Sequence, residues 1–294
     1  MDRQAELAIV RRAFAKQILA AARIADPRIE AAFAEVRRED FLGPGPWDIF
    51  RIPSTYDPTA DADPVLLYVD QVVGLIPERG INNGQPSLHA MLLAAAGIEE
   101  GEHVVHVGAG TGYYTAMMAF LTGPTGRVTA IEYDSALAAR ARTNLADNAA
   151  VCVLEGDGAT TPFDAADVIY VNAGVTHPAD SWLDGLADGG RLILPLSTDA
   201  NVRSVGLGHF DPIKAMRSGA FFRIQRRGAV FEARGLLPTA IIPAECVRDK
   251  TAEAALAAAF DKGGWNTVTR LIRGEVVPEE RCWLRGRGWC LAYD

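Results

Sequence analysis

Glycines at every second position form the most informative segment of this 294-residue chain. The segment reads Val107-Gly108-Ala109-Gly110-Thr111-Gly112-Tyr113, between an apolar run at 103–107 and a helix-like stretch at 113–121. Glycine lets a ligand approach the backbone and permits positive φ. The free N–H groups of a helix N-terminus attract an anionic group. The sequence therefore predicts a ligand-binding turn between a strand and a helix.

Acidic residues follow the next two expected strands. Glu132 comes directly after 128–131 and lies 20 positions beyond Gly112, where a carboxylate can accept hydrogen bonds from ribose hydroxyls. Gly156-Asp157-Gly158 follows the strand expected at 151–154, and Asp157 is placed to accept a hydrogen bond from an adenine amino group. An ordinary Asp-Gly turn is the alternative there. Together the two acids favour a nucleoside cofactor.

Two kinds of cofactor share this geometry. The dinucleotide fingerprint needs Gly or Ala at position 113, but Tyr113 is bulky where a helix and a strand must pack closely. The G-x-G-x-G form resembles the glycine motif of class I S-adenosylmethionine (SAM) methyltransferases. SAM is therefore the expected cofactor, with S-adenosyl-L-homocysteine as its product. A nicotinamide or flavin site and a purely structural glycine turn are the alternatives.

The fourth expected strand, 167–171, is followed by Asn172. The resemblance implies that this position faces the methyl group. Amino-methylating enzymes of nucleic acids carry N/D-P-P-Y/F/W there, whereas Ala-Gly-Val follows Asn172. The formal net charge of −8 also disfavours non-specific nucleic-acid binding, so no nucleic-acid partner is expected. His177 follows on the ligand side and is a candidate for a hydrogen bond to substrate, with a solvated loop histidine as the alternative.

The elements that position these residues alternate between strand and helix. Expected strands at 103–107, 128–131, 151–154, 167–171 and 191–196 enclose helices at 113–121, 134–148 and 180–186. This order predicts an α/β, doubly wound, mostly parallel seven-stranded sheet, a Rossmann-like SAM methyltransferase fold, with ligands at the carboxyl ends of the strands. Helical periodicity at 3–24 and 28–38 predicts N-terminal helices, and 50–86 is rich in loops.

After Leu196 the alternation ends. Strands are expected at 202–210, 220–226, 229–233, 267–272 and 281–293, with a helix at 251–261. The expected divisions are N-terminal helices and a substrate-side loop at 1–80, a SAM-binding core at 81–235, and a small α+β appendage at 236–294.

The ordered motifs resemble the protein-L-isoaspartate O-methyltransferase family over about residues 5–235. The matching segments, in chain order, are Arg37–Leu42, Gln85–Ala90, His103–Tyr113, Glu132, Gly156–Gly158, Asn172–Pro178 and Gly189–Pro195. The resemblance implies methyl transfer from SAM to a carboxylate. It implies cofactor contacts by the following residues: Gln85, His89, Gly108, Ala109, Gly110, Thr111, Gly112, Tyr113, Glu132, Gly156, Asp157, Gly158 and Asn172. A partly buried structural role is the alternative for His89.

The chain departs from the family at the substrate loop. The family has T-I-S-x-P there, whereas this chain reads Ile81-Asn82-Asn83-Gly84-Gln85-Pro86, so that Gly84 stands where the serine belongs. Asn82, Asn83, Gly84 and His177 are the expected substrate-side residues. A protein or peptide carboxylate is the expected acceptor. The alternatives are a methyltransferase with a small-molecule acceptor, a non-catalytic SAM-binding module, and an NAD-dependent oxidoreductase.

Cysteines and hydropathy set the remaining expectations. Cys152, Cys246, Cys282 and Cys290 show no C-x-x-C spacing, so neither a metal site nor a redox pair is predicted, and reduced thiols in a cytoplasmic protein are expected. The longest apolar run, 91–98, is too short for a membrane span, and charges interrupt the N-terminus where a secretory signal would be apolar.

Overall fold

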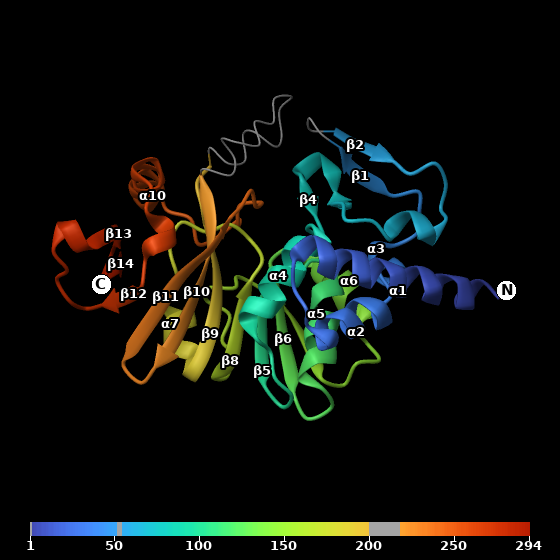
Figure 1. The fold of residues 1–294 in the computed structure, drawn as a ribbon, viewed down its shortest axis with the longest axis horizontal. Coiled ribbons are helices and arrows are strands. Elements are labelled where there is room, and N and C mark those ends of the chain that lie inside the picture. Colours follow the sequence, from blue (N-terminus) through green and yellow to red (C-terminus); the bar gives the residue numbers. More distant parts are fainter. Residues whose placement is uncertain (1, 52–54, 200–217) are drawn as a thin grey trace. The chain divides into compact units, whose positions relative to one another are not determined.

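The computed structural model describes residues 2–51, 55–199 and 218–294 (Figure 1). They divide into two compact units, Met1–Val104 with Ala109–Gly156, and Val105–Gly108 with Asp157–Asp294. Strand β5, His103–Val107, has residues in both. The strand predicted at 202–210 lies outside the described residues. The predicted boundaries at 80/81 and 235/236 stay predictions.

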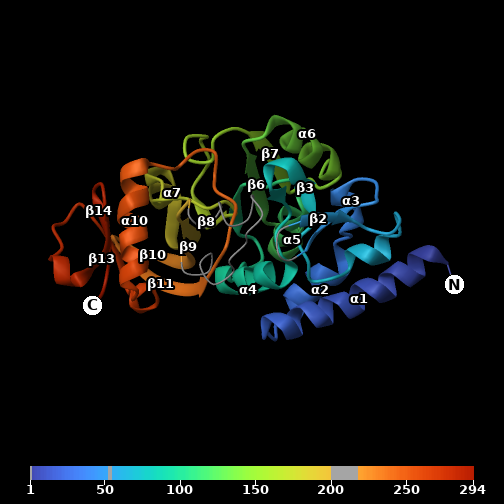
Figure 2. The ribbon, with the colours of Figure 1, turned by 90° about the horizontal axis from the view of Figure 1, so that it is seen from above.

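The first unit combines helices with parallel strands in the order β5-β6-β7. Strand β6 pairs in parallel with β7, from Val128↔Val151 to Glu132↔Glu155. Right-handed crossovers place the helices after β5 and β6 on one face of these strands, and α4 packs against α1 and α2 (Figure 2). The main elements are α1 Arg3–Ala22, α2 Pro27–Glu35, α3 Glu39–Leu42, α4 Pro86–Ala96, α5 Tyr113–Thr122, β6 Arg127–Glu132, α6 Ser135–Asn144 and β7 Val151–Glu155.

Capping residues explain several of these boundaries. The Asp26 side chain accepts hydrogen bonds from the first turn of α2, and Asp134 does the same for α6. Gly97 ends α4 in the left-handed conformation. The helical periodicity of the N-terminal segment is therefore confirmed as α1 and α2, with the short α3 after them.

The stretch 50–86 is more regular than the sequence predicted. It contains two small antiparallel strand pairs, because its prolines and glycines mark turns between short strands. The elements are β1 Asp48–Arg51, β2 Thr55–Pro58, η1 Pro64–Leu67, β3 Gly74–Ile76, η2 Pro77–Arg79 and β4 Ile81–Asn82.

The second unit contains a run of strands in the order β5-β8-β9-β10-β11-β12-β14-β13. Strands β8 and β9 pair in parallel, and every pair from β9 to β13 is antiparallel. The predicted seven strands correspond to β5–β11, and three C-terminal strands extend the sheet because β12 pairs with β11. The elements are β8 Ala166–Val171, α7 Asp180–Gly185, β9 Leu186–Ser197, β10 Gly219–Arg227, β11 Val230–Pro238, α10 Lys250–Lys262, η3 Trp265–Thr267, β12 Arg270–Arg273, η4 Glu279–Arg281, β13 Cys282–Gly286 and β14 Trp289–Ala292.

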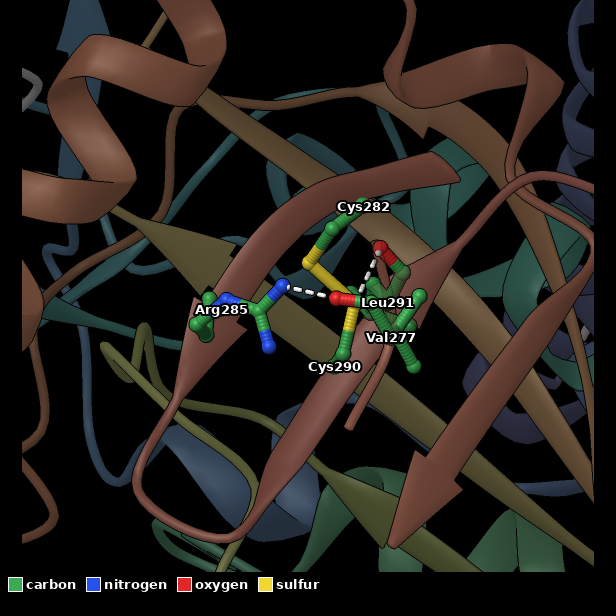
Figure 3. Close-up of a disulfide and its surroundings, with 5 residues drawn as sticks. All are labelled: Val277, Cys282, Arg285, Cys290 and Leu291. Atoms are coloured by element: carbon green, nitrogen blue, oxygen red, sulfur yellow. Dashed lines mark hydrogen bonds between the residues drawn. A yellow bond between two sulfur atoms is a disulfide. The ribbon is translucent and has the colours of Figure 1, made fainter. Parts of the chain in front are cut away.

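Two expectations for the C-terminus are wrong. The single strand predicted at 281–293 is a hairpin, since the chain turns between β13 and β14 with Gly288 at positive φ. The hairpin brings the Cα atoms of Cys282 and Cys290 to 6.2 Å, and the two form a disulfide (Figure 3). The expectation that all four cysteines are reduced thiols is therefore wrong. The sequence analysis did not predict the turn that brings Cys282 and Cys290 together.

Each unit has an apolar core. Phe14, Ile18 and Phe33 are buried in the first, and Tyr170, Trp182, Phe221 and Phe222 in the second. Trp283 is buried against Phe222 and Phe260. Within 2–51, 55–199 and 218–294, no helix has the length and apolar character that crossing a membrane requires.

Candidate functional site

The glycine turn of the first unit is bonded to the acid at the end of β6. Glu132 Oε2 accepts a hydrogen bond from the Gly110 N–H at 2.7 Å, and its Oε1 accepts one from the Asp134 N–H at 2.9 Å. The Ala109 N–H donates to the Ile131 carbonyl at 3.3 Å. The turn is therefore held against the end of β6 by hydrogen bonds within the chain.

Burial sets the electrostatics of Glu132. The residue is 8% exposed, and this burial raises the pKa of the carboxyl, while the N–H groups of Asp134, Gly110 and Tyr133 lower it. A carboxylate has about four lone-pair sites, which is more than these backbone N–H groups can fill. Ribose hydroxyls are the donors that such an oriented acceptor suits, so the residues present fit a SAM nucleoside.

Close packing requires a glycine at position 112 of this turn. Gly112 has φ +96°, and a Cβ there would lie 2.6 Å from Leu145 Cδ1. Thr111 is buried, and its carbonyl accepts a hydrogen bond from Asn144 Nδ2 at 3.0 Å. Tyr113 begins α5 and is fully buried, with its ring against Phe41.

The two asparagines of the substrate loop hold the loop itself. Asn82 Nδ2 donates to Tyr56 Oη at 3.0 Å, and its Oδ1 accepts from the Gly84 N–H at 2.9 Å. Asn83 Oδ1 accepts from the Val73 N–H at 3.1 Å. Asn83 Nδ2 is buried and has no hydrogen-bond partner among the described residues. It is the one amide donor of this pair that the loop itself leaves unused.

Gly84 lies in close contact with the His89 ring. Gly84 has φ +75°, and a Cβ at this position would lie 2.3 Å from His89 Nε2. The His89 ring is 1% exposed and stacks on Tyr114, with ring centroids 3.5 Å apart and planes 15° apart. The imidazole therefore occupies the space in which a side chain at position 84 would begin. This contact is a physical reason for the missing hydroxyl residue.

The start of α4 is capped from a distant loop. Gln85 is the N-cap residue, but its own side chain makes no cap hydrogen bond. Asp70 supplies the acceptor instead, with Oδ1 bonded to the Ser87 N–H at 2.9 Å and Oδ2 to Gln85 Nε2 at 3.2 Å. Nothing in the local sequence of α4 points to Asp70, so it was missed.

The predicted site residues of the second unit lie next to strands β5 and β8. Gly108 follows β5, Asp157 and Gly158 precede β8, and Asn172 and His177 follow β8. The Asn172 N–H donates to the Val107 carbonyl at 2.8 Å, and a Cβ on Gly108 would lie 3.3 Å from the Asn172 carbonyl oxygen. A Cβ on Gly158 would lie 2.3 Å from Val107 Cγ1. The glycines at 108 and 158 therefore permit close backbone packing here.

Asp157 and His177 both have local partners. Asp157 Oδ1 accepts the Ala159 N–H at 2.8 Å and so begins a turn. His177 Nδ1 lies 3.0 Å from Thr176 Oγ1. Burial lowers the pKa of His177, although Asp249 and Asp180 raise it. The low pKa favours the neutral imidazole, which can accept or donate one hydrogen bond near neutral pH.

The structure thus groups the predicted residues within each unit. In the first it joins Glu132 to the glycine turn and Gly84 to His89. In the second it joins Asn172 to β5 and Gly158 to Val107. No group of three or more His, Cys, Asp or Glu side chains within the described ranges is arranged to hold a metal ion.

Solved structures share this architecture. One protein-L-isoaspartate O-methyltransferase superimposes with a TM-score of 0.62 and 24% identity, covering 79% of this chain and 66% of the other. A Plasmodium falciparum chain described as such a methyltransferase, in complex with S-adenosyl-L-homocysteine, gives 0.60 and 16%, covering 79% and 97%. These likenesses show the fold: the doubly wound, mostly parallel α/β fold of SAM methyltransferases, as the sequence predicted.

Sequence comparison identifies the family within that class. The family model of protein-L-isoaspartate(D-aspartate) O-methyltransferase matches residues 11–205, about two thirds of the chain. A Methanoregula boonei protein-L-isoaspartate O-methyltransferase is 32% identical over 211 residues, covering 69% of this chain and 82% of the relative. The Thermotoga maritima enzyme of that name is 30% identical over 173 residues, and the match spans half of its length. This chain belongs to the protein-L-isoaspartate O-methyltransferase family, which confirms the resemblance seen in the sequence.

Proposed function

We propose that this chain is a SAM-dependent O-methyltransferase that methylates the side-chain carboxylate of L-isoaspartyl residues in proteins and peptides. Family membership supports the reaction and the cofactor. The observation that carries the proposal is the Glu132 carboxylate, held by two backbone N–H groups next to the glycine turn. An acceptor fixed in this way binds ribose hydroxyls without reorganising.

Methyl transfer to a carboxylate requires the chain only to bind and align the two reactants. Bound SAM supplies an activated methyl group, which passes to the acceptor oxygen by in-line displacement. An Asp-like carboxyl has a pKa near ~4 and is ionised at neutral pH, so no general base is required. The chain's residues orient the carboxylate and exclude water.

Each predicted residue has a proposed role. Glu132 binds the ribose, Gly108–Tyr113 lies against the methionine end of the cofactor, and Asp157 with Gly156 and Gly158 binds the adenine. His89, Gln85 and Asn172 contact the cofactor. Asn83 Nδ2 is the proposed substrate-side donor, because it is buried and unused among the described residues, and His177 is a second one. The cytoplasmic location stays a prediction.

One observation favours a second candidate, a SAM methyltransferase with a different acceptor, including a small molecule. The close approach of His89 to Gly84 excludes the hydroxyl side chain that the family has at this position. Family membership nevertheless favours the protein carboxylate.

Two peptides that differ only in one residue test the proposal. The purified chain is incubated with methyl-labelled SAM and a peptide containing L-isoaspartate, beside the same peptide with ordinary L-aspartate. We expect a base-labile methyl ester on the isoaspartyl peptide alone. SAM binding with no ester on either peptide would refute the proposed acceptor and favour the second candidate.

A further inference from the structure

A buried arginine holds the chain that connects η1 to β3 in the first unit. Arg38 comes directly before α3 and is 0% exposed. Its guanidinium donates to the carbonyl of Leu67, to that of Val69 at 3.0 Å and to that of Gln71 at 2.8 Å. We call residues 67–71 the tethered segment, because one side chain is bonded to it at three points.

The surroundings of this arginine show what its charge is used for. The rings of Phe14 and Tyr113 flank the guanidinium, each with its centroid 6.0 Å from Cζ. Within the described ranges, the hydrogen bonds of Arg38 go to carbonyl and amide oxygens and none goes to a carboxylate. Burying a charge without an opposite charge costs free energy. The bonds to the tethered segment are therefore what arginine adds here over an apolar side chain.

The tethered segment carries the residue that caps α4. Asp70 lies between the second and third bonded carbonyls. Its Oδ1 accepts the Ser87 N–H at 2.9 Å, and its Oδ2 accepts a hydrogen bond from Gln85 Nε2 at 3.2 Å. Arg38 thus fixes the backbone on both sides of this cap, and the cap in turn holds the end of the substrate loop.

Arg38 also reaches the amide of Asn83 in the substrate loop. Its Nη2 lies 3.5 Å from Asn83 Oδ1, a long hydrogen bond, and the Val73 N–H donates to the same oxygen at 3.1 Å. The Asn83 N–H donates to the Val73 carbonyl at 3.0 Å. Two donors at one end of the amide decide which end is the acceptor. The other end, Nδ2, is the buried donor without a partner among the described residues.

We propose that Arg38 is a positioning residue of the methyl transfer: through the tethered segment and Asn83 Oδ1 it sets the direction in which Asn83 Nδ2 is presented to the substrate carboxylate. This inference rests on the proposed function, which makes Asn83 a substrate-side donor. A donor whose orientation the chain fixes loses less freedom when the substrate binds. Without that orientation the amide can turn and present its oxygen to the carboxylate, which weakens binding.

Steady-state kinetics with an isoaspartyl peptide and SAM test the proposal. Arg38→Met keeps the long apolar stem but removes every donor. Arg38→Lys keeps the charge, but an ammonium lacks the planar fork that bonds several carbonyls at once. Arg37→Met is the matched control, since the neighbouring Arg37 is exposed and pairs with Asp40 at 2.6 Å. Calorimetric titration with S-adenosyl-L-homocysteine is run on every variant.

We expect Arg38→Met to raise KM for the peptide about tenfold, close to the effect of one hydrogen bond to a charged group. Arg38→Lys should raise KM as well, and Arg37→Met should leave it unchanged. The value of kcat and the affinity for S-adenosyl-L-homocysteine should stay the same in all three, because the lost contact binds the ground state and the transition state of the peptide equally. If Arg38→Met does not fold, Arg38→Lys carries the comparison.

A double-mutant cycle separates positioning from a purely structural role. Asn83→Ala removes the donor itself and should raise KM for the peptide by a similar factor. Adding Arg38→Met, or Arg38→Lys, to Asn83→Ala should then change KM little, because no donor remains to be oriented. A residue that only stabilises the fold would instead add its full effect and would also weaken binding of S-adenosyl-L-homocysteine.

Three results would overturn the inference while leaving the proposed function intact. They are an unchanged KM in the Arg38 variants, an unchanged KM in Asn83→Ala, and additive effects of the two substitutions in the cycle. If the unmodified chain forms no methyl ester on the isoaspartyl peptide, the proposed function itself fails, and the inference fails with it.

Discussion

The contact between Gly84 and His89 makes a quantitative prediction about the substrate loop. Replacing Gly84 by alanine places a Cβ in a left-handed conformation, which costs roughly 1–2 kcal/mol, and presses it against a buried ring. Overpacking of this kind costs about 1–3 kcal/mol more. We therefore expect Gly84→Ala to lower the free energy of unfolding by about 2–5 kcal/mol.

Gly80 provides a matched control in the same loop region. It has φ +69°, close to the +75° of Gly84, but a Cβ there would meet nothing within 4 Å. Gly80→Ala should thus cost only the left-handed conformation. Urea unfolding followed by circular dichroism measures both variants, and the difference between them isolates the contact with His89.

A double-mutant cycle completes the test. His89→Ala removes the ring that Gly84→Ala presses against, so the double variant should be more stable than the sum of the single losses predicts, by about 1–3 kcal/mol. Equal losses for Gly80→Ala and Gly84→Ala, or strictly additive losses in the cycle, would refute the reasoning. By the same reasoning, Gly84→Ser alone should not increase methylation of an isoaspartyl peptide.

Three further predictions follow from individual contacts. Because burial raises the pKa of Glu132, affinity for S-adenosyl-L-homocysteine should fall on acidification at a higher pH than an ordinary Glu near ~4.3 would cause. Glu132→Gln should remove this dependence in calorimetric titrations, and an unchanged profile would contradict it. Since the folded pKa is raised, this carboxyl adds stability at low pH that is lost as the pH rises through that pKa. Asp134→Ala removes the α6 cap and the partner of Arg79, and should cost about 0.5–2 kcal/mol of unfolding free energy. Because Arg79 lowers the pKa of Asp134, the loss should shrink as the pH falls through that pKa; a pH-independent loss would argue against the ion pair. Unfolded without reductant, the chain should show two reactive thiols of its four cysteines, since Cys282 and Cys290 are bonded; four would exclude the disulfide.

Local signals predicted much of the first unit. Neighbouring residues predicted the strand, glycine turn and helix around Gly112, and they predicted a helix at 134–148 where α6 lies. The spacing from Gly112 to Glu132 pointed to an acid beside the turn, and the Gly110–Glu132 bond fits that prediction. Such features depend on interactions within one turn or between consecutive βα units.

Contacts between distant segments were not predictable in this way. From the sequence, Gly84 appears only as the loss of the family's hydroxyl side chain. The structure shows that the His89 ring occupies the space of a side chain at this position. The hairpin that pairs Cys282 with Cys290 was missed because its turn carries only a weak signal, an Arg-Gly-Arg-Gly run.

The sequence by itself determined the class of fold, the glycine turn and the family, since these signals depend on periodicity and on the order of short motifs along the chain. Only the tertiary structure decided that the segment around Ile242 and Ala244 returns to the loop after β8, where both residues form backbone hydrogen bonds with Gly174. The physical reason is that these partners come from separate elements. Their approach depends on how β8, β11 and α10 pack in the second unit, which no local pattern of residues records.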